Sequence, residues 1–380
     1  MIKIGLMGFD FNNPNKGCEA LSYSFVNMIS EIIDEKIEIH VFGYADLGRF
    51  PEKYPKIKFV WHRLKMKNPI YWSKLKKAFE ECNCVFDITY GDGFSDIYGK
   101  VWNVNTDMAK QIANISRTPL VLLPQTYGPY ENNFLKKWAV YIVKNCALAL
   151  SRDQQSADEM SVWGCKKVIP ATDLAFALPF DRNKYSLESD KIKIGINVSS
   201  LLWDGGHNIN LVTNYQEYCR RIITKYTSNP NFQIHLIPHV IDKKNYDSLE
   251  NDSRICNILH KEFPDTVLAP DFDTPIDAKS YICNMNVFIG ARMHSTIGSM
   301  SSGVPTIPFS YSKKFEGLFG NLNYPYVISA TQIDTNEAVC LTERYIQDRA
   351  VLEEVRKESI GRVNQMLSSV KMEIIKLLFK

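Results

Sequence analysis

The sequence has no long hydrophobic run and no marked excess of charge of one sign. No stretch reaches the roughly 18 apolar residues that a membrane-spanning helix needs. Lys and Arg together number 45 and Asp and Glu 42, which leaves a formal net charge of +3 on 380 residues. So small a charge argues against the strongly basic surface of a nucleic-acid-binding protein, although a local basic pocket for a small anion is compatible with it.

The nine cysteines are scattered along the chain, and none belongs to a CxxC pair. This pattern predicts buried thiols in a reducing compartment rather than a disulfide framework or a zinc site. The first residues, MIKIGLMGFDF, also lack the apolar run and the cleavage site of a signal peptide. We therefore expect a cytoplasmic protein, and peripheral contact with the inner face of the membrane stays open.

Several catalytic signatures are missing as well. The sequence contains neither GxGxxG nor GxxxxGKS/T, so a dinucleotide or ATP site has no support. HExxH is absent, and so is the GxSxG turn that carries the nucleophile of many hydrolases. We therefore expect neither a metal nor a cofactor.

The sequence does show short apolar strands alternating with helices, over a length that suits two domains. In the first half, strands are predicted at 2–8, 37–43, 57–61, 83–89, 119–123 and 146–150. Helices are predicted at 19–34, 70–81, 101–115, 132–144 and 153–163. This alternation is typical of parallel βαβ units with both sheet faces covered.

A polar segment at 181–191, DRNKYSLESDK, predicts a linker, after which the alternation starts again. The second series of predicted strands lies at 192–197, 232–237, 266–268, 286–289 and 304–308. The expected fold class is α/β, with two doubly wound, Rossmann-like domains facing a cleft in a GT-B-like architecture. We expect domains at 1–180 and 192–334, and a helical tail at 335–380 that packs back on the first domain.

The segment 286–305, NVFIGARMHSTIGSMSSGVP, holds the strongest candidate site. It runs from a strand into a helix, and ligands of open α/β sheets sit beyond the carboxyl ends of the strands. The N–H groups of a helix start suit a phosphate or a carboxylate. Arg292 adds a bidentate partner for either group, and His294 adds a proton donor or acceptor near neutral pH.

Further candidates follow other strands. Arg152 opens a predicted helix, where a cation is unfavourable unless an anion is near. In the loop 91–99, Gly91 and Gly93 would let a ligand approach the backbone, and Asp92 can accept hydrogen bonds from sugar hydroxyls. Aromatic residues of the same loops, Tyr90 and Tyr98 among them, can stack on sugar rings or pack in the core. Weaker candidates at strand ends are Gln125, Asn197, His239 and Lys313, and His239 is as compatible with a packed or capping role.

Together these segments resemble the polysaccharide pyruvyl transferase family. The matching segments, in the family's order, are NKGCEAL (15–21), ITYGDGF (88–94), LPQTYGP (123–129), LSRDQQS (150–156), TDLAF (172–176), GINVS (195–199), IPHV (237–240), GARMHSTIGSMSSGVP (290–305) and YSKKF (311–315). The chain departs from the family at 91–93, where Gly-Asp-Gly replaces an expected run of three glycines.

The resemblance implies phosphoenolpyruvate as donor, two hydroxyls of a sugar as acceptor and a pyruvate ketal as product. The sugar is implied to belong to an exopolysaccharide or capsule, or to its lipid-linked oligosaccharide precursor. The first domain would then hold the acceptor and the second the donor. No metal is expected, because arginines offset the donor's charge.

The resemblance also assigns residues to these two sides. The implied donor-binding residues are Arg152, Arg292, Met293 and His294, to which we add Lys313. The expected acceptor-binding residues are Gly91, Asp92, Gly93, Gln125, Asn197 and His239. We assign His294 as the catalytic general acid or base.

Two alternatives remain. A GT-B glycosyltransferase with a nucleotide sugar would share the architecture, so the fold alone does not decide. Retaining members often hold the nucleotide ribose with a carboxylate, yet residues 284–315 contain no Asp or Glu, which favours a donor without a ribose. The second alternative is a sugar- or anion-binding protein without catalytic activity.

Overall fold

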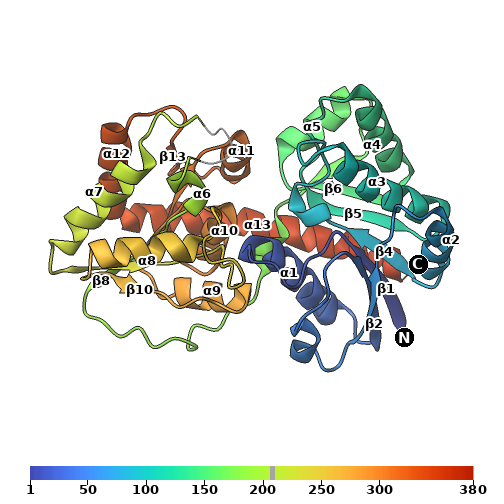
Figure 1. Cartoon of the computed structure of the whole chain (residues 1–380), viewed down its shortest axis with the longest axis horizontal. Coiled ribbons are helices and arrows are strands. Elements are labelled where there is room, and N and C mark those ends of the chain that lie inside the picture. Colours follow the sequence, from blue (N-terminus) through green and yellow to red (C-terminus); the bar gives the residue numbers. More distant parts are fainter. Residues whose placement is uncertain (206–209, 380) are drawn as a thin grey trace. The chain divides into compact units, whose positions relative to one another are not determined.

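Helices and strands alternate along the computed structural model, which describes residues 1–205 and 210–379 and, at Lys313 and Lys314, the backbone alone. The chain divides into two compact units (Figure 1). Unit 1 comprises Met1–Asn13, Leu21–Leu174 and Gln365–Lys380, and unit 2 comprises Pro14–Ala20 and Ala175–Asn364. Each unit is built on its own parallel sheet, which confirms the prediction of two doubly wound, Rossmann-like domains.

The sheet of unit 1 has seven strands in the order β3-β2-β1-β4-β5-β6-β7, all parallel. The strands are β1 (Ile2–Met7), β2 (Ile37–Gly43), β3 (Lys58–Arg63), β4 (Cys84–Asp87), β5 (Leu120–Gln125), β6 (Leu148–Ser151) and β7 (Val168–Pro170). The helices between them are α1 (Lys16–Ile32), α2 (Pro69–Glu80), α3 (Lys100–Ile115), α4 (Asn133–Asn145) and α5 (Gln154–Val162). The strand order reverses at β1, so the carboxyl ends of β1 and β4 form the crevice where such sheets bind ligands.

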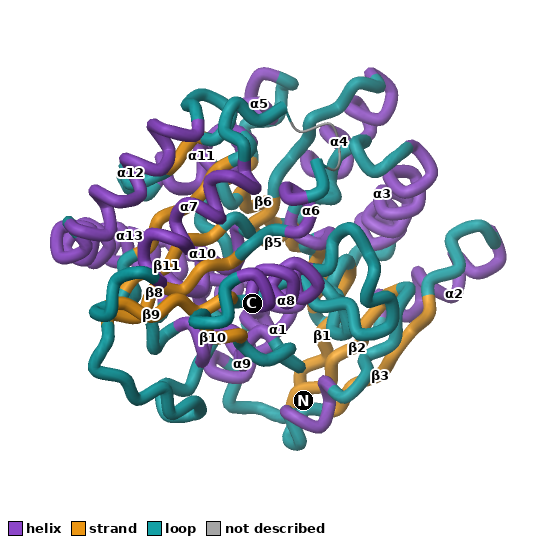
Figure 2. Tube along the Cα trace, turned by 60° about the vertical axis from the view of Figure 1, so that its left-hand side comes forward, coloured by secondary structure: helices purple, strands orange, loops and turns teal. Residues whose placement is uncertain are grey.

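The sheet of unit 2 has six parallel strands in the order β10-β9-β8-β11-β12-β13 (Figure 2). The strands are β8 (Ile192–Asn197), β9 (Phe232–Leu236), β10 (Val267–Leu268), β11 (Val287–Gly290), β12 (Thr306–Ser310) and β13 (Ile328–Ser329). The helices are α6 (Ser200–Trp203), α7 (Tyr215–Thr227), α8 (Asp252–Glu262), α9 (Pro275–Ile282), α10 (Met293–Ser301), α11 (Lys313–Asn321), α12 (Thr335–Gln347) and α13 (Arg349–Leu378). The order reverses at β8, which makes the ends of β8 and β11 the expected ligand position.

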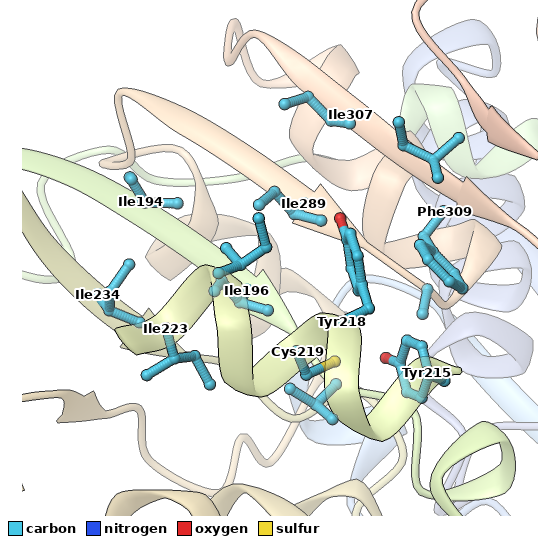
Figure 3. Close-up of a cluster of buried hydrophobic side chains, with 14 of the residues drawn as sticks. Ile194, Ile196, Tyr215, Tyr218, Cys219, Ile223, Ile234, Ile289, Ile307 and Phe309 are labelled. Carbon is cyan, nitrogen blue, oxygen red and sulfur yellow. The ribbon is translucent and has the colours of Figure 1, made fainter. Parts of the chain in front are cut away.

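The core of unit 2 lies between helix α7 and the sheet. Figure 3 shows the side chains that fill this layer, with Tyr215, Tyr218, Cys219 and Ile223 on the helix and Ile194, Ile196, Ile234, Ile289, Ile307 and Phe309 on the strands. The β-branched residues pack well on a pleated sheet, while the period of the helix brings its apolar positions onto one face. The hydroxyl of Tyr218 keeps a hydrogen-bond partner in this core, Oγ1 of Thr342 at 2.8 Å. The core therefore holds β8 and β11 rigidly at the positions where the candidate site begins.

The structure differs from the sequence-based expectation at a few elements. The short strands β7 and β13 were not predicted, and α1 starts at Lys16 instead of residue 19. The early start has a tertiary cause, because the backbone of Pro14–Lys16 pairs with His239–Ile241. The expected linker at 181–191 lies within unit 2, where Arg182 donates to the carbonyl oxygens of Cys283 and Ser302. Of the expected tail, only Gln365–Lys380 belongs to unit 1 by its contacts.

Candidate functional site

The turn from β11 to α10 in unit 2 carries Arg292 and His294, as the sequence predicted. Arg292 is the N-cap residue of α10, and its own side chain makes no capping hydrogen bond. The backbone N–H of Arg292 and the hydroxyl of Ser295 both donate to Oδ1 of Asn197, at 2.9 and 3.0 Å. Asn197 at the end of β8 therefore fixes this turn, and its predicted contact with the acceptor stays a prediction.

The guanidinium of Arg292 forms an ion pair with a buried carboxylate that the sequence did not reveal. Its Nη2 lies 2.8 Å from Oδ1 of Asp252, and its Nε lies 3.3 Å from both carboxylate oxygens. Nη2 also donates to the carbonyl oxygen of Glu250 at 3.0 Å. Burial acts to lower the pKa of Arg292, but the charge of Asp252 outweighs it and the pKa lies above its usual value. Arg292 is thus held permanently charged at the site.

Asp252 joins three strand ends of unit 2. It is 0% exposed and opens α8. Besides Arg292 it accepts hydrogen bonds from the backbone N–H groups of Ser200, Val240 and His239, at 2.9, 2.9 and 3.2 Å. Through these hydrogen bonds the carboxylate fixes the loops that follow β8, β9 and β11 relative to one another.

His239 lies beside Arg292 and His294. Its side chain is 4% exposed, and neither ring nitrogen has a hydrogen-bond partner among the described residues. Burial, and then the neighbouring charges of His294, Arg292 and Lys16, lower the pKa of His239 well below its usual value. His239 is therefore neutral, and its ring is available to a ligand that brings negative charge or a hydroxyl group. The sequence assigned it to the acceptor, whereas the structure places it among the predicted donor residues.

The first turn of α1 also contributes to this site, and sequence reasoning did not single it out. A methyl group added at Gly17 would lie 2.7 Å from Cγ of His294, so only glycine leaves room for that imidazole ring. The backbone N–H of Lys16 donates to the carbonyl oxygen of His239 at 3.1 Å, and its ammonium group pairs with Glu19 at 2.7 Å. The signal was present as the Lys-Gly pair in NKGCEAL, at the start of a helix that follows a strand.

In unit 1, Arg152 occupies a similar position at the end of β6 and the start of α5. Its Nε donates to Oγ1 of Thr126 at 2.8 Å, and its Nη1 pairs with Oδ2 of Asp173 at 3.1 Å. Burial acts to lower the pKa of Arg152, but Asp173, Asp92 and Asp153 together raise it above its usual value. The structure thus surrounds this predicted donor-binding residue with carboxylates.

The loop predicted to hold the acceptor lies next to Arg152. Gly91 packs on the guanidinium so closely that an added methyl would be 3.1 Å from Nη1. Gly93 is buried, and Asp92 between the two glycines is partly exposed. Gln125 is fully buried, with its amide 3.4 Å from the carbonyl oxygen of Asp87. Gly91, Asp92 and Gly93 therefore lie next to Arg152, whereas the side chain of Gln125 is buried against Asp87.

Met293 and Lys313 are the remaining predicted donor-binding residues. Met293 is the first residue of α10, next to Arg292 and His294, and is half-buried. The side chain of Lys313, predicted to join the donor site, lies outside the part of the chain that the structure describes. A cavity of about 420 Å³ in unit 2, lined by residues between Leu202 and Gln216, contains none of the predicted site residues.

The described residues contain neither a cluster of metal-binding side chains nor a helix suited to crossing a membrane. No group of three or more His, Cys, Asp or Glu side chains has the arrangement of a metal site. None of the described helices is both long and apolar enough to cross a membrane.

Comparison with known proteins gives one family. The model of the family described as polysaccharide pyruvyl transferase matches residues 15–313. Among curated protein sequences, none matches the chain significantly.

Solved structures similar to the chain include enzymes that act on nucleotide sugars. A UDP-GlcNAc 2-epimerase from Neisseria meningitidis bound to UDP-GlcNAc has a TM-score of 0.63 at 10% identity, with 100% of both chains covered. A glycosyltransferase from Rickettsia africae has a TM-score of 0.62 at 13% identity, covering 100% of this chain and 99% of the other. The S. aureus MnaA–UDP structure has a TM-score of 0.60 at 13% identity, covering 100% and 98%. At this level of identity the likeness shows the GT-B-like fold and nothing of the substrate.

Proposed function

Because the chain belongs to the polysaccharide pyruvyl transferase family, we propose that it transfers pyruvate from phosphoenolpyruvate to two hydroxyls of a sugar. The product is a pyruvate ketal on a cell-surface polysaccharide or on its lipid-linked precursor. The observation that carries this proposal is the β11–α10 turn of unit 2. There Arg292, His294 and His239 gather around the start of α10, and the side chain of its N-cap residue makes no capping hydrogen bond.

This turn suits a small dianionic or trianionic donor. A helix start attracts negative charge, and the Arg292 guanidinium, held by Asp252 and Glu250 through Nε and Nη2, adds a fixed positive charge and the N–H donors of Nη1. Among residues 284–315 the sequence places no acid that would repel such a ligand. Asp252 faces Arg292 but has its lone pairs directed at backbone N–H groups, which leaves less of its negative charge to act against a ligand.

The chemistry that we propose needs one proton to move onto carbon. A sugar hydroxyl adds to C2 of phosphoenolpyruvate while C3 takes a proton and becomes the methyl group. The second hydroxyl then forms the other C–O bond at C2 as the bond from C2 to the phosphate oxygen breaks, and its proton leaves with the phosphate. His294 is the proposed acid or base, because an imidazole exchanges protons near neutral pH. Phosphoenolpyruvate is the co-substrate, and the scheme calls on no other cofactor.

Thermal unfolding with phosphoenolpyruvate, and separately with UDP-sugars, tests the donor. A ligand that binds only the folded protein raises its stability by about 2.7 kcal/mol at a hundredfold excess over the dissociation constant. We expect a shift with phosphoenolpyruvate that Arg292→Lys loses, because lysine keeps the charge beside Asp252 but not the paired donors. Arg221→Lys is the matched control, since Arg221 is a partly exposed arginine paired with Glu217. A shift with a UDP-sugar alone would contradict the proposal and favour glycosyl transfer.

A further inference from the structure

The loop that follows β4 in unit 1 has an unusual backbone. Thr89, Tyr90 and Gly91 have φ angles of 38°, 57° and 91° in succession. A positive φ is uncommon outside glycine and is a real outlier for a β-branched residue such as threonine. Conformations of this kind persist only where the surrounding structure imposes them, and they concentrate at ligand-binding positions.

The neighbouring backbone imposes this conformation. The N–H of Tyr90 donates to the carbonyl oxygen of Gly8 at 2.8 Å, and the N–H of Gly93 donates to that of Thr89 at 2.9 Å. A methyl group added at Gly8 would overlap the backbone of Thr89. Since Gly8 follows β1, the loop occupies the point where the strand order of this sheet reverses.

A buried charge network lies beneath the same loop. The hydroxyl of Thr89 donates to Oδ2 of Asp87 at 2.7 Å. The ammonium group of Lys110 lies 3.9 Å from Asp87, 3.6 Å from Asp107 and 4.6 Å from the ring centre of Phe94. Burial raises the pKa of both Asp87 and Asp107, that of Asp107 to about 7, so this group is costly to assemble, and the hydrogen bond from Thr89 joins it to the loop.

The loop presents an aromatic side chain to a row of others. The ring centre of Tyr90 is 5.3 Å from that of Trp102 on α3, and Trp102 is 6.4 Å from Tyr44, which follows β2. Tyr90 and Trp102 are partly exposed, and Tyr44 is 39% exposed. By contrast, Phe94 and Tyr127 of the neighbouring loops are buried in the core. The row therefore offers aromatic surface at the carboxyl edge of the sheet.

A carboxylate completes this surface. Asp92 follows the strained residues, is partly exposed, and accepts a hydrogen bond from the hydroxyl of Tyr98 at 3.0 Å. Its negative charge opposes a phosphate or carboxylate ligand, whereas its oxygens suit hydroxyl donors. Aromatic faces suit the C–H face of a sugar ring. The combination therefore favours a neutral sugar over an anion.

We propose that Tyr44, Trp102 and Tyr90, with Asp92 beside them, form a subsite for a neutral pyranose ring of the acceptor. The role of this sugar as the acceptor rests on the proposed function. The binding of a sugar at this subsite does not depend on the donor. The strained loop and the buried network beneath it keep Tyr90 and Asp92 in place before the sugar arrives. The ring stacks on the aromatic row, and Asp92 accepts hydrogen bonds from its hydroxyls.

Saturation-transfer NMR on the whole protein tests the subsite, with methyl glycosides of galactose, glucose, mannose and N-acetylmannosamine as probes. We expect at least one probe to receive saturation from the wild type, and its signal to fall at least fivefold in Tyr90→Asn and in Trp102→Leu. Asparagine tolerates a left-handed backbone, so Tyr90→Asn removes the ring without disturbing the turn. Trp138→Leu is the matched control, because Trp138 is a partly buried tryptophan on α4 that packs on the core of unit 1.

The outcomes separate this proposal from the proposed function. If no probe receives saturation from the wild type, or if the signal survives in both variants, the subsite is wrong. If the signal falls in both variants but also in Trp138→Leu, the loss is not specific to the aromatic row and the proposal is overturned. If sugar binding follows the prediction while phosphoenolpyruvate gives no thermal shift, the subsite stands and the donor assignment fails.

Discussion

The two arginine turns of the molecule look alike in sequence but differ in the side chains that surround them. Arg292 in unit 2 and Arg152 in unit 1 each follow a buried strand, open a helix and pair with a buried aspartate. Around Arg292 the other groups that act on its charge are Tyr311 and Glu250, and the neighbouring His239 also lies near His294 and Lys16. Around Arg152 they are carboxylates, including Asp92 and Asp153.

This difference shows how an arginine can serve two roles at equivalent positions. Arg292 has one ion-paired carboxylate, Asp252, and shares its turn with two imidazole side chains that add no negative charge, an arrangement that suits an anion. A guanidinium among three aspartates is close to neutralised, so its main effect is to fix the loop at Gly91. The donor assignment therefore depends more on Arg292 than on Arg152.

The largest effect that we expect is on stability when either aspartate partner is removed. Breaking a buried ion pair from one side typically costs about 3–5 kcal/mol, because a charge stays buried without a partner. Asp252→Ala should cost more than Asp173→Ala, because Asp252 also accepts from three backbone N–H groups. Urea unfolding of both variants measures the difference. Equal losses would mean that the backbone contacts of Asp252 contribute little.

Gly17→Ala should impair activity strongly while leaving most of the fold intact. The added methyl would push the imidazole of His294 away, and a displacement near 1 Å at a catalytic group can cost about a hundredfold in rate. Gly361→Ala is the matched control, because a methyl there meets nothing within 4 Å. We expect kcat to fall far more than KM changes. An unchanged kcat in Gly17→Ala would contradict the proposed role of His294.

The two arginines can be compared directly by conservative substitution. Replacing Arg292 by lysine should weaken phosphoenolpyruvate binding by at least tenfold, about 1.4 kcal/mol, because paired donors to the anion are lost. Arg152→Lys should weaken it less, because Asp173, Asp92 and Asp153 surround Arg152 with negative charge that opposes an anionic ligand. Titration calorimetry with phosphoenolpyruvate decides between them. A larger loss in Arg152→Lys would reverse the comparison.

The parts of the fold that the sequence predicted are those set by local pattern. All six residues of β5 are buried, and its continuous apolar run from Leu120 to Leu123 is of the kind that identifies an inner strand. The strands that escaped prediction, β7 and β13, have only three and two residues. The start of α1 at Lys16 escaped prediction although Asn15 accepts a hydrogen bond from the N–H of Gly17, because this turn is also held by pairing with a segment more than 200 residues away.

The same distinction applies to the candidate site. The Arg292–His294 turn could be predicted because a strand end, a glycine and a helix start follow one another along the chain. Asp252 could not, because its partners come from three separate loops that only the folded sheet brings together. Trp102 and Tyr44 escaped for the same reason, since they meet Tyr90 from different elements of unit 1.

The smallest expected effect concerns pH and the neutral His239. In the unfolded chain a histidine takes up a proton near pH 6.5, whereas burial and the charges of His294, Arg292 and Lys16 keep the pKa of His239 well below its usual value in the folded protein. Stability should therefore fall as the pH drops below about 6.5, by about 1 kcal/mol per pH unit from this residue. His239→Gln should remove that part of the acid sensitivity, as measured by urea unfolding between pH 7 and pH 5. Bound phosphoenolpyruvate should reduce the same sensitivity in the wild type, because its negative charge favours the protonated ring; parallel profiles with and without the donor would place the anion away from His239.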